Sequence, residues 1–288
     1  MENKTPGKLF LCATPIGNLE DITFRVLETL RSVDLIAAED TRHSIKLLNH
    51  FEIKTPMTSY HEFNKIDKGK YLVDQLLQGI NIALVTDAGT PAISDPGEEL
   101  VRMCLDAGIE VTSLPGPAAC VTALTMSGLS ARRFCFEGFL PTDKKERNQV
   151  LERLKNETRT TVMYEAPHRL VRTMEILEEV LGDRRIVFCK ELTKKHERRM
   201  EMTCREALAC FEKEEPRGEF VLVIEGQDPE VLLEEERSSW EQMSIEEHME
   251  VYTDQGMNRK EAMKAVAADR GVSKRDIYQA LLDHEQGD

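Results

Sequence analysis

Charged side chains follow short apolar runs at several points of this 288-residue chain. Asp87 comes two positions after the apolar run 82–85, and Glu39, Asp40 and Arg42 come after the run 34–38. Such groups at the end of a buried strand cost desolvation energy unless they line a cleft or pair with one another. Carboxylates of this kind can take a proton or hold a cation, and a guanidinium can hold a phosphate. The pattern predicts a polar cleft, although a helix cap at Asp40 or Thr41 explains part of the second cluster as well.

Further polar clusters separate the other apolar runs, and each could face the same cleft. They lie at 60–64 (Tyr-His-Glu-Phe-Asn), 165–169 (Glu-Ala-Pro-His-Arg), 191–197 (Glu-Leu-Thr-Lys-Lys-His-Glu) and 218–220 (Gly-Glu-Phe). For any single residue in them, an ordinary ion pair at a cleft edge is the plainer interpretation.

The elements that must position these residues follow a strand, loop, helix order. The run 82–85 predicts a buried strand, 86–97 a loop, and the amphipathic stretch 100–105 a helix, which is the unit of a parallel sheet. Gly89 and Gly97 permit positive φ or a close approach of the backbone to a ligand, and Pro91 and Pro96 stiffen the loop. In open α/β sheets ligands lie beyond the carboxyl ends of such strands, where Asp87 would project. An ordinary strand-to-helix connection fits this spacing equally well.

The same alternation runs through most of the chain and predicts an α/β protein. Strands are expected at 9–13, 34–38, 57–59, 82–85, 109–114, 134–140, 160–164, 185–190, 198–203 and 220–224, with helices at 23–33, 44–50, up to 78, 146–155, 167–181 and up to 213. The sequence lacks the glycine-rich patterns of dinucleotide folds and phosphate-binding loops. Pro115, Gly116 and Pro117 end a strand abruptly, so we place a domain boundary near Gly116.

The last sixty residues have a different character. Residues 228–243 form an acidic linker or helix with the only tryptophan, Trp240. Ser244, Asn258 and Ser273 are predicted to cap three helices, and Gly271 separates the last two, as in a helix-turn-helix module. Nucleic-acid contact and a packing or dimerisation role both remain open for residues 244–288.

Composition narrows the class of protein. Hydrophobic residues make up 41% and charged residues 31% of the chain, no apolar run could cross a membrane, and the polar residues 1–8 do not resemble a secretion signal, so we expect a cytoplasmic protein. Seven cysteines without a C-x-x-C pair predict reduced, mostly buried thiols. The net charge of −14 argues against a nucleic-acid ligand. Nine acidic residues within 228–250 weaken that argument, because basic residues cluster elsewhere, near 132–133, 144–147, 184–185 and 190–199.

With these loops in view, the sequence resembles the tetrapyrrole (corrin/porphyrin) methylase superfamily. The resemblance rests on Ala-Thr-Pro-Ile-Gly-Asn-Leu at 13–19, Ala-Ala-Glu-Asp-Thr-Arg at 37–42, His61 with Asn64, 83–91, 95–97, 114–117, 164–165 with 168–170, 191–194 and 218–226. It implies two α/β domains, 1–116 and 117–227, with S-adenosylmethionine in the cleft between them, followed by the acidic segment 228–243 and the helical module 244–288. The positions that match cofactor contacts of the superfamily are Pro15, Thr86, Asp87, Ala88, Ala118, Ala119, Tyr164, Glu165, Phe220 and Val221.

The chain departs from the tetrapyrrole enzymes where they carry Gly-Asp-Pro, because here Thr-Asp-Ala-Gly-Thr-Pro occupies 86–91. The departure favours the branch of the superfamily that methylates RNA. It implies transfer of a methyl group to the ribose 2′-hydroxyl of a cytidine in 16S ribosomal RNA, with the small ribosomal subunit as partner, a homodimeric state, no metal and no membrane. The 2′-hydroxyl is a weak acid that must attack in line. Glu39 or His61 is expected to handle its proton, and Arg42 and Lys194 to contact phosphate or the developing oxyanion.

Two other functions compete with this hypothesis. Methylation of a tetrapyrrole carbon would leave the C-terminal helices without a use. A non-enzymatic regulator that binds nucleic acid through the helix-turn-helix would need residues 244–288 alone to bind duplex with a steep salt dependence.

Overall fold

The computed structural model describes residues 5–241 and 243–285, and their side chains except those at 235–237, 239, 241, 284 and 285. Of the predicted segments, positions 1–4, 242 and 286–288 lie outside the described residues. The chain divides into two compact units, one of residues 1–155 and 159–225, the other of 156–158 and 226–288. The division near Gly116, between the two expected α/β domains, stays a prediction.

The first sheet is wholly parallel. Its order is β3-β2-β4-β1-β5, formed by β1 (Leu9–Cys12), β2 (Leu35–Ala38), β3 (Met57–Ser59), β4 (Ile82–Val85) and β5 (Val111–Leu114). Because all five strands run the same way, all their carboxyl ends lie at one edge. The loops that follow the strands therefore meet there, as expected for an open α/β sheet.

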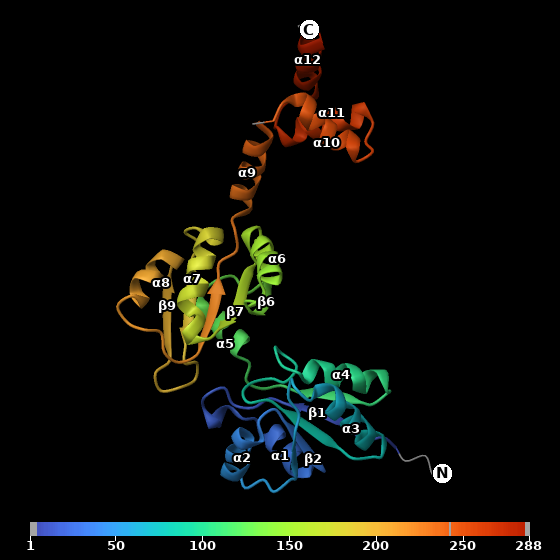
Figure 1. Ribbon diagram of the computed structural model, residues 1–288, viewed down its shortest axis with the longest axis vertical. Helices are drawn as coiled ribbons and strands as arrows, with labels where there is room; N and C mark the ends of the chain where they lie inside the picture. The colour runs from blue at the N-terminus through green and yellow to red at the C-terminus, as the bar shows by residue number, and fades with distance from the viewer. Residues whose placement is uncertain (1–4, 242, 286–288) are drawn as a thin grey trace. The chain divides into compact units, whose positions relative to one another are not determined.

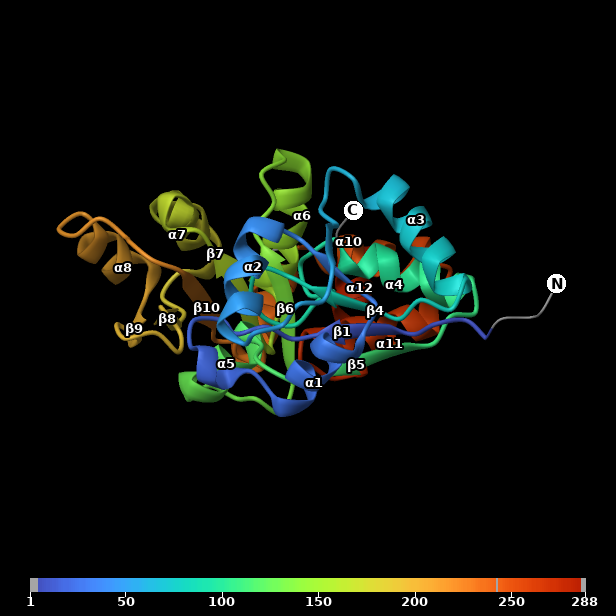
Figure 2. The same cartoon turned by 90° about the horizontal axis from the view of Figure 1, so that it is seen from below.

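Helices cover both faces of this sheet: α1 (Phe24–Ser32), α2 (Thr41–His50), α3 (Lys65–Leu77) and α4 (Gly97–Asp106), with the short η1 (Leu19–Asp21) before α1. Alternate side chains of a strand point to opposite faces. Leu84 thus packs with Leu72 and Leu100 of α3 and α4, whereas Val85 packs with Leu30 of α1. Figure 2 shows α3 and α4 on one side of β1, β4 and β5 and α1 on the other. We call this layer of residues 9–114 lobe 1.

The second sheet is mixed. Its order is β6-β7-β10-β8-β9, formed by β6 (Phe134–Phe139), β7 (Thr160–Glu165), β8 (Ile186–Lys190), β9 (Arg198–Met202) and β10 (Phe220–Ile224). Strands β6 and β7 are parallel, and the other neighbouring pairs are antiparallel. Glu165 and Lys190 both pair with Phe220, so the ends of β7 and β8 lie beside the start of β10.

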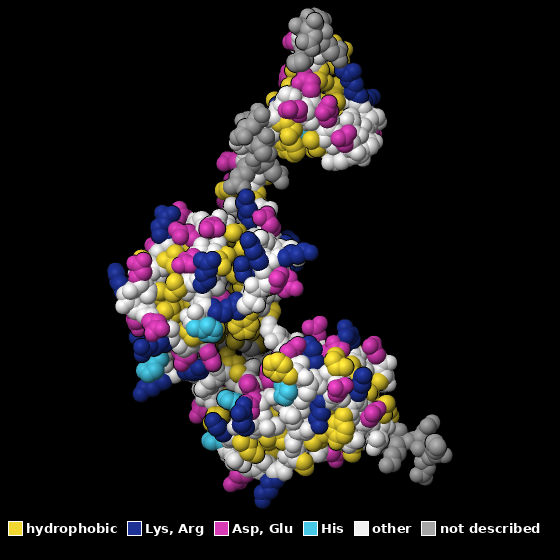
Figure 3. Space-filling view, in the orientation of Figure 1, with side chains coloured by type: hydrophobic (Ala, Val, Ile, Leu, Met, Phe, Trp, Pro, Cys, Tyr) yellow, Lys and Arg dark blue, Asp and Glu magenta, His cyan; other side chains and the backbone are white. Residues whose placement is uncertain are grey.

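Helices cover both faces of the second sheet as well (Figure 1): α5 (Ala119–Ser127) packs on one face, and α6 (Lys144–Lys155), α7 (Pro167–Leu181) and α8 (Cys204–Phe211) on the other. We call this layer of residues 119–224 lobe 2. Lys and Arg side chains gather on its surface over α6 (Figure 3), the helix that carries Lys144, Lys145, Arg147, Arg153 and Lys155.

Helix α5 is absent from the sequence prediction. Nearly all its residues are small or apolar, so the segment lacks the alternation of polar and apolar faces that reveals a surface helix. Cys120 and Leu124 pack against Val162 and Val223 of the second sheet. Gly128, with φ of 78°, ends the helix in the left-handed region that favours glycine.

The second unit contains four helices within the described residues: α9 (Pro229–Glu241), α10 (Ile245–Asp254), α11 (Arg259–Asp269) and α12 (Lys274–Glu285). The acidic segment is therefore largely helical. Ser244 and Asn258 each form a capping box, and Ser273 Oγ accepts from the backbone N–H of Asp276, which confirms the three predicted caps. Val266 and Ile277 lie in a small core of their own.

Within the part of the chain that the structure describes, no helix is both long and apolar enough to cross a membrane.

Candidate functional site

A cavity of about 450 Å³ lies where loops of lobe 1 meet strand ends of lobe 2. Lobe 1 contributes loops after three parallel strands, and lobe 2 contributes the start of α5 and one edge of its sheet. From lobe 1 the lining residues are Ile16, Glu39, Thr86, Asp87, Ala88, Gly89, Thr90, Ile93, Ser94 and Asp95. From lobe 2 and from Ala118 just before it they are Ala118, Ala119, Phe139, Tyr164, Glu165, Ala166, Pro167, Cys189, Leu192, Glu219, Phe220 and Val221.

Asp95 shapes the loop between β4 and α4. Its carboxylate accepts from the backbone N–H groups of Ala92, Ile93 and Gly97, at 3.0, 3.1 and 2.7 Å. Ala92 and Ser94 adopt φ of 70° and 63°, a region that costs energy for residues other than glycine. Burial raises the pKa of Asp95, and the three N–H groups oppose that rise. The carboxylate therefore holds a strained loop in one conformation.

The other loops of lobe 1 hold one another through backbone contacts. Thr14 and Gly89 exchange two hydrogen bonds, of 2.9 and 3.0 Å, between the loops after β1 and β4. The Thr90 hydroxyl donates to the Pro117 carbonyl at 2.8 Å, beyond β5. Asp87 Oδ1 accepts from the backbone N–H of Asp40 at 3.2 Å, after β2. These contacts hold the loops on the lobe 1 side of the cavity in one arrangement.

The cavity is acidic. Five of its lining residues are carboxylates (Glu39, Asp87, Asp95, Glu165 and Glu219), and no Lys, Arg or His belongs to the lining. Burial raises the pKa of Glu39, and the neighbouring charges of Asp87, Asp95 and Asp40 raise it further, against a backbone hydrogen bond from Asp87. Clustered carboxylates in a partly desolvated space favour a cationic ligand.

Both oxygens of Glu165 have partners within lobe 2. One oxygen accepts from the Thr173 hydroxyl at 2.6 Å, and the other accepts from the N–H of Ala166 at 2.8 Å and lies 3.4 Å from Arg169 Nε. This network ties the end of β7 to the first turns of α7. Glu165 therefore fixes the cavity wall of lobe 2, as Asp95 fixes the loop of lobe 1.

Tyr164 joins the aromatic wall to the start of α5. Its ring lies edge-on to Phe136 and Phe139, at centroid distances of 5.0 and 5.6 Å, and its hydroxyl accepts from the N–H of Cys120 at 3.2 Å. Burial raises the pKa of Tyr164. Ala118 precedes α5 and offers no side-chain cap. The first N–H groups of a helix attract anions, so this end of the cavity suits a negatively charged group.

Most of the predicted site residues come together in this cavity. Of the ten positions expected to contact the cofactor, nine line it: Thr86, Asp87, Ala88, Ala118, Ala119, Tyr164, Glu165, Phe220 and Val221. Pro15 does not, although its neighbour Ile16 does. Of the four residues expected to take part in the reaction, Glu39 alone lines the cavity.

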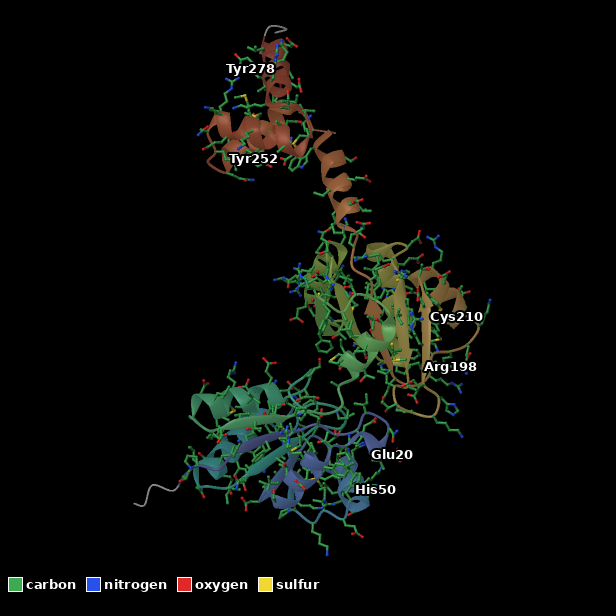
Figure 4. All side chains as sticks on the ribbon, turned by 180° about the vertical axis from the view of Figure 1, so that it is seen from behind. Glu20, His50, Arg198, Cys210, Tyr252 and Tyr278 are labelled. Atoms are coloured by element: carbon green, nitrogen blue, oxygen red, sulfur yellow. The ribbon has the colours of Figure 1, made fainter. Side chains whose placement is uncertain are left out.

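The other three lie outside the lining. Arg42 is 90% exposed at its side chain and pairs with Asp40 at 2.8 Å. His61 lies in the turn after β3, where its N–H donates to Asn64 Oδ1 at 2.8 Å. Lys194 Nζ lies 3.0 Å from both Glu191 and Glu219, and the latter lines the cavity. Lys194 also borders a second hollow with Glu20 and His50, two residues of lobe 1 labelled in Figure 4.

Several lining residues were not named as site residues in the sequence analysis, including Asp95, Phe139 and Cys189. Leu192 and Glu219 also line the cavity, and they lie in the clusters 191–197 and 218–220 that were expected to face a cleft. Asp95 had a signal, because it stands in the Asp-Pro-Gly step at 95–97 that ends the loop. Phe139 and Cys189 lie within apolar strands, where nothing in the sequence distinguishes a core position from a cavity wall. Among the described residues, no group of three His, Cys, Asp or Glu side chains could hold a metal ion.

The fold has clear relatives among solved structures. Uroporphyrin-III C-methyltransferase from Thermus thermophilus matches with a TM-score of 0.55 and 18% identity, over 75% of this chain and 94% of that one. The same enzyme complexed with S-adenosylhomocysteine matches with a TM-score of 0.54, at 18% identity over 76% and 92%. Diphthine synthase matches with a TM-score of 0.61 and 12% identity, over 76% and 90%. These structures share the fold of this chain over about three quarters of its length.

Sequence comparison gives the family. The family model for Tetrapyrrole (Corrin/Porphyrin) Methylases matches residues 8–208. Proteins called ribosomal RNA small subunit methyltransferase I are 51% identical in Halalkalibacterium halodurans (94% of this chain, 93% of that one) and 49% identical in Bacillus subtilis (95% and 94%). The one from Thermotoga maritima is 46% identical over 222 residues, which are 77% of this chain and all of its own. The chain belongs to the tetrapyrrole methylases and, within them, to the ribosomal RNA small subunit methyltransferase I family.

Proposed function

We propose that this chain transfers a methyl group from S-adenosylmethionine to the ribose 2′-hydroxyl of a cytidine in the 16S RNA of the small ribosomal subunit. The observation that carries the proposal is the acidic cavity, whose lining has five carboxylates and no basic side chain. The relatives' name supports the RNA substrate, and the departure from Gly-Asp-Pro at 86–91 disfavours a porphyrinoid.

The chemistry of the lining suits each part of the methyl donor. S-Adenosylmethionine carries a sulfonium and an ammonium, and the carboxylates of Asp87, Asp95 and Glu219 can balance these charges. Its adenine needs apolar walls, which Ile16 and Val221 provide. Its carboxylate matches the first N–H groups of α5, where the N-cap residue Ala118 offers no side-chain acceptor.

Transfer requires alignment more than acid–base power. The 2′-oxygen attacks the methyl carbon opposite sulfur, so the oxygen–carbon bond forms as the carbon–sulfur bond breaks, and the sulfonium becomes a neutral sulfide. The hydroxyl proton leaves to a base. We assign that base to Glu39, because it lines the cavity and its raised pKa makes its carboxylate a better proton acceptor than an exposed one. His61 is the alternative, and Arg42 and Lys194 are assigned to RNA phosphates at the rim.

The test is incubation of the purified protein with methyl-labelled donor and small subunits that lack the modification. We expect label in the RNA, recovered after nuclease digestion as 2′-O-methylcytidine. Absence of label from RNA would refute the proposal. Label in a porphyrinoid instead would establish the rival carbon methylation.

We also propose that the protein acts in the cytoplasm as a homodimer. The support for dimerisation is the resemblance to the methylase superfamily, together with amphipathic C-terminal helices. Sedimentation of the full chain at micromolar concentration is expected to give twice the mass of one chain, and a monomer would refute the dimer.

A further inference from the structure

An exposed aromatic side chain stands at the edge of lobe 1 that carries the cavity. Phe63 follows β3 and is 97% exposed. Because the first sheet is parallel, the end of β3 lies at the same edge as the loops that line the cavity. Two strand intervals separate β3 from β4, a distance of about 10 Å. A phenyl ring exposed to water lacks the favourable free energy of burial, and a ligand that covers the ring would supply it.

The position of Phe63 is fixed by its neighbours on both sides. Tyr60 is buried, and its hydroxyl donates to the Pro96 carbonyl at 2.9 Å, within the loop that Asp95 shapes. On the other side Asn64 closes a tight turn, since its Oδ1 accepts from the N–H of His61 at 2.8 Å and its own N–H donates to the His61 carbonyl at 2.9 Å. Phe63 is therefore held at the tip of a braced turn beside the cavity loop.

The surroundings of the ring suit a nucleotide. The His61 ring lies edge-on to Phe63 at a centroid distance of 6.1 Å, and its buried Nδ1 has no hydrogen-bond partner among the described residues. Glu62, the nearest acid in sequence, pairs with Lys65, which balances its charge. Arg42 projects into solvent from the joint after the neighbouring strand β2. An aromatic face, a histidine and an exposed guanidinium form a common combination for single-stranded RNA.

We propose that Phe63 is a stacking platform for an unpaired base of the RNA substrate, which positions the target ribose over the cavity. The proposal rests on the proposed function, because it supplies the contact through which that substrate is held. Chemistry on one ribose requires its nucleotide to leave a regular helix, and an unstacked base finds its most general partner in an aromatic face. Phe63 is thus a positioning residue and takes no part in proton transfer.

The experiment compares Phe63→Ala, Phe63→Tyr and the control Leu105→Ala in the full chain. Leu105 is an exposed apolar residue of lobe 1 in the last turn of α4, at the opposite edge of the sheet. Three quantities are measured: the Kd for S-adenosylmethionine, kcat/KM on undermethylated small subunits, and binding of a single-stranded oligoribonucleotide of small-subunit sequence in the presence of S-adenosylhomocysteine. Phe63→Ala is expected to lower kcat/KM and RNA affinity about five- to a hundredfold, the loss of one stacked base, with the donor Kd unchanged.

Phe63→Tyr keeps the aromatic face and is expected to stay within about threefold of the parent, and Leu105→Ala to match it. Unchanged RNA affinity and kcat/KM in Phe63→Ala would overturn the platform, as would equal losses in Leu105→Ala. A parent protein that binds RNA without methylating it would refute the proposed function, and the affinity of Phe63→Ala would then decide the platform alone. A parent that binds no RNA would refute both.

Discussion

Glu39 contributes to the negative charge of the cavity and is also the proposed proton acceptor of methyl transfer. It lines the cavity, and burial together with Asp87, Asp95 and Asp40 raises its pKa above the usual 4.5. A cationic donor stabilises the ionised form, so binding of the donor must compete with protonation of Glu39. Donor affinity should therefore decline as the pH falls from neutrality toward 4.5, before an exposed carboxylate would protonate.

The prediction is that calorimetric Kd values for S-adenosylmethionine rise on acidification and that Glu39→Gln flattens most of this dependence while lowering kcat. Asp95 has a raised pKa as well, so its protonation accounts for the residual slope. Glu110→Gln is the matched control, because Glu110 lies before β5 and pairs with Lys8 away from the cavity. A pH profile of Glu39→Gln identical to the parent's would contradict the assignment.

The sequence analysis identified the polar positions near the cavity, but it did not show which of their side chains line it. Thr86, Asp87 and Ala88 follow a buried strand and line the cavity as expected. Arg42 and Lys194 stand in equally polar joints, yet nearby carboxylates pair with them outside the lining. The turns of the backbone decide which side chain of a polar cluster faces the cavity. Glu191 and Thr193, for example, adopt positive φ, and a single sequence does not predict such a conformation at these residue types.

Among the elements, α5 connects the cavity to the core of lobe 2. Its first residues line the cavity, and Leu124, 4% exposed, packs against Val162 and Val223. Leu124→Ala is expected to reduce the free energy of unfolding of the first unit by about 2–5 kcal/mol, because a cavity opens between helix and sheet. Val121→Ala, in the same helix but 49% exposed, should change it by less than about 0.5 kcal/mol.

Chemical denaturation followed by circular dichroism measures both variants. Equal effects at positions 121 and 124 would contradict the packing of α5.

Helix α5 also shows why part of the fold could not be predicted from the sequence. Strands and amphipathic helices were predicted from the periodicity of their apolar residues, and an apolar helix of nine residues has no such periodicity. The antiparallel pairing of β10 with β7 and β8 likewise follows from long-range contacts that no local pattern encodes.

Helices α9 and α10 meet at a buried histidine. His248 is fully buried and stacks on Trp240 at a centroid distance of 4.0 Å, while its Nδ1 accepts from Arg270 Nε at 3.1 Å and its Nε2 lies 3.2 Å from Asp269. Burial, helped by Arg270, lowers the pKa of His248 below 6.5. A histidine with a lowered pKa contributes stability above pH 6.5 that is lost as the pH falls through its folded pKa.

The second unit should therefore unfold more readily as the pH drops below 6.5. Trp240 is the only tryptophan of the chain, so its fluorescence during urea unfolding reports on this unit alone. His248→Gln is expected to unfold at lower urea at neutral pH and to lose this part of the pH dependence. A parent whose urea midpoint by fluorescence stays constant through this range would contradict the prediction.

Basic and acidic residues are unevenly distributed between the segments of the chain. Residues 117–227 carry 20 of the 38 lysines and arginines and 19 of the 52 acidic residues. Residues 228–288 carry 7 lysines and arginines and 16 acidic residues. The net charge of −14 therefore says little about RNA binding, because the acidic excess lies outside lobe 2 and is greatest in the C-terminal segment. A surface for phosphates is better sought on lobe 2 than on the helices of the second unit.

The first unit holds the complete cavity within residues 16–221, with its own cores on both faces of both sheets. The Thermotoga maritima relative is spanned over its full length by 222 residues of this chain. A chain ending at Gln227 is therefore expected to fold, to bind S-adenosylmethionine with a Kd within about twofold of the full chain, and to methylate small subunits at a kcat/KM no lower than half, since the removed segment is acidic and repels phosphates.

Calorimetry and the labelling assay, at two salt concentrations, measure these quantities, and residues 228–288 expressed alone serve as the reciprocal control. That fragment should bind neither the donor nor duplex. Duplex binding by the fragment with a steep salt dependence, together with loss of RNA methylation in the shortened chain, would assign recognition to the helix-turn-helix and contradict the distribution of charge argued for lobe 2. Loss of donor binding in a folded shortened chain would instead show that the cavity depends on the second unit.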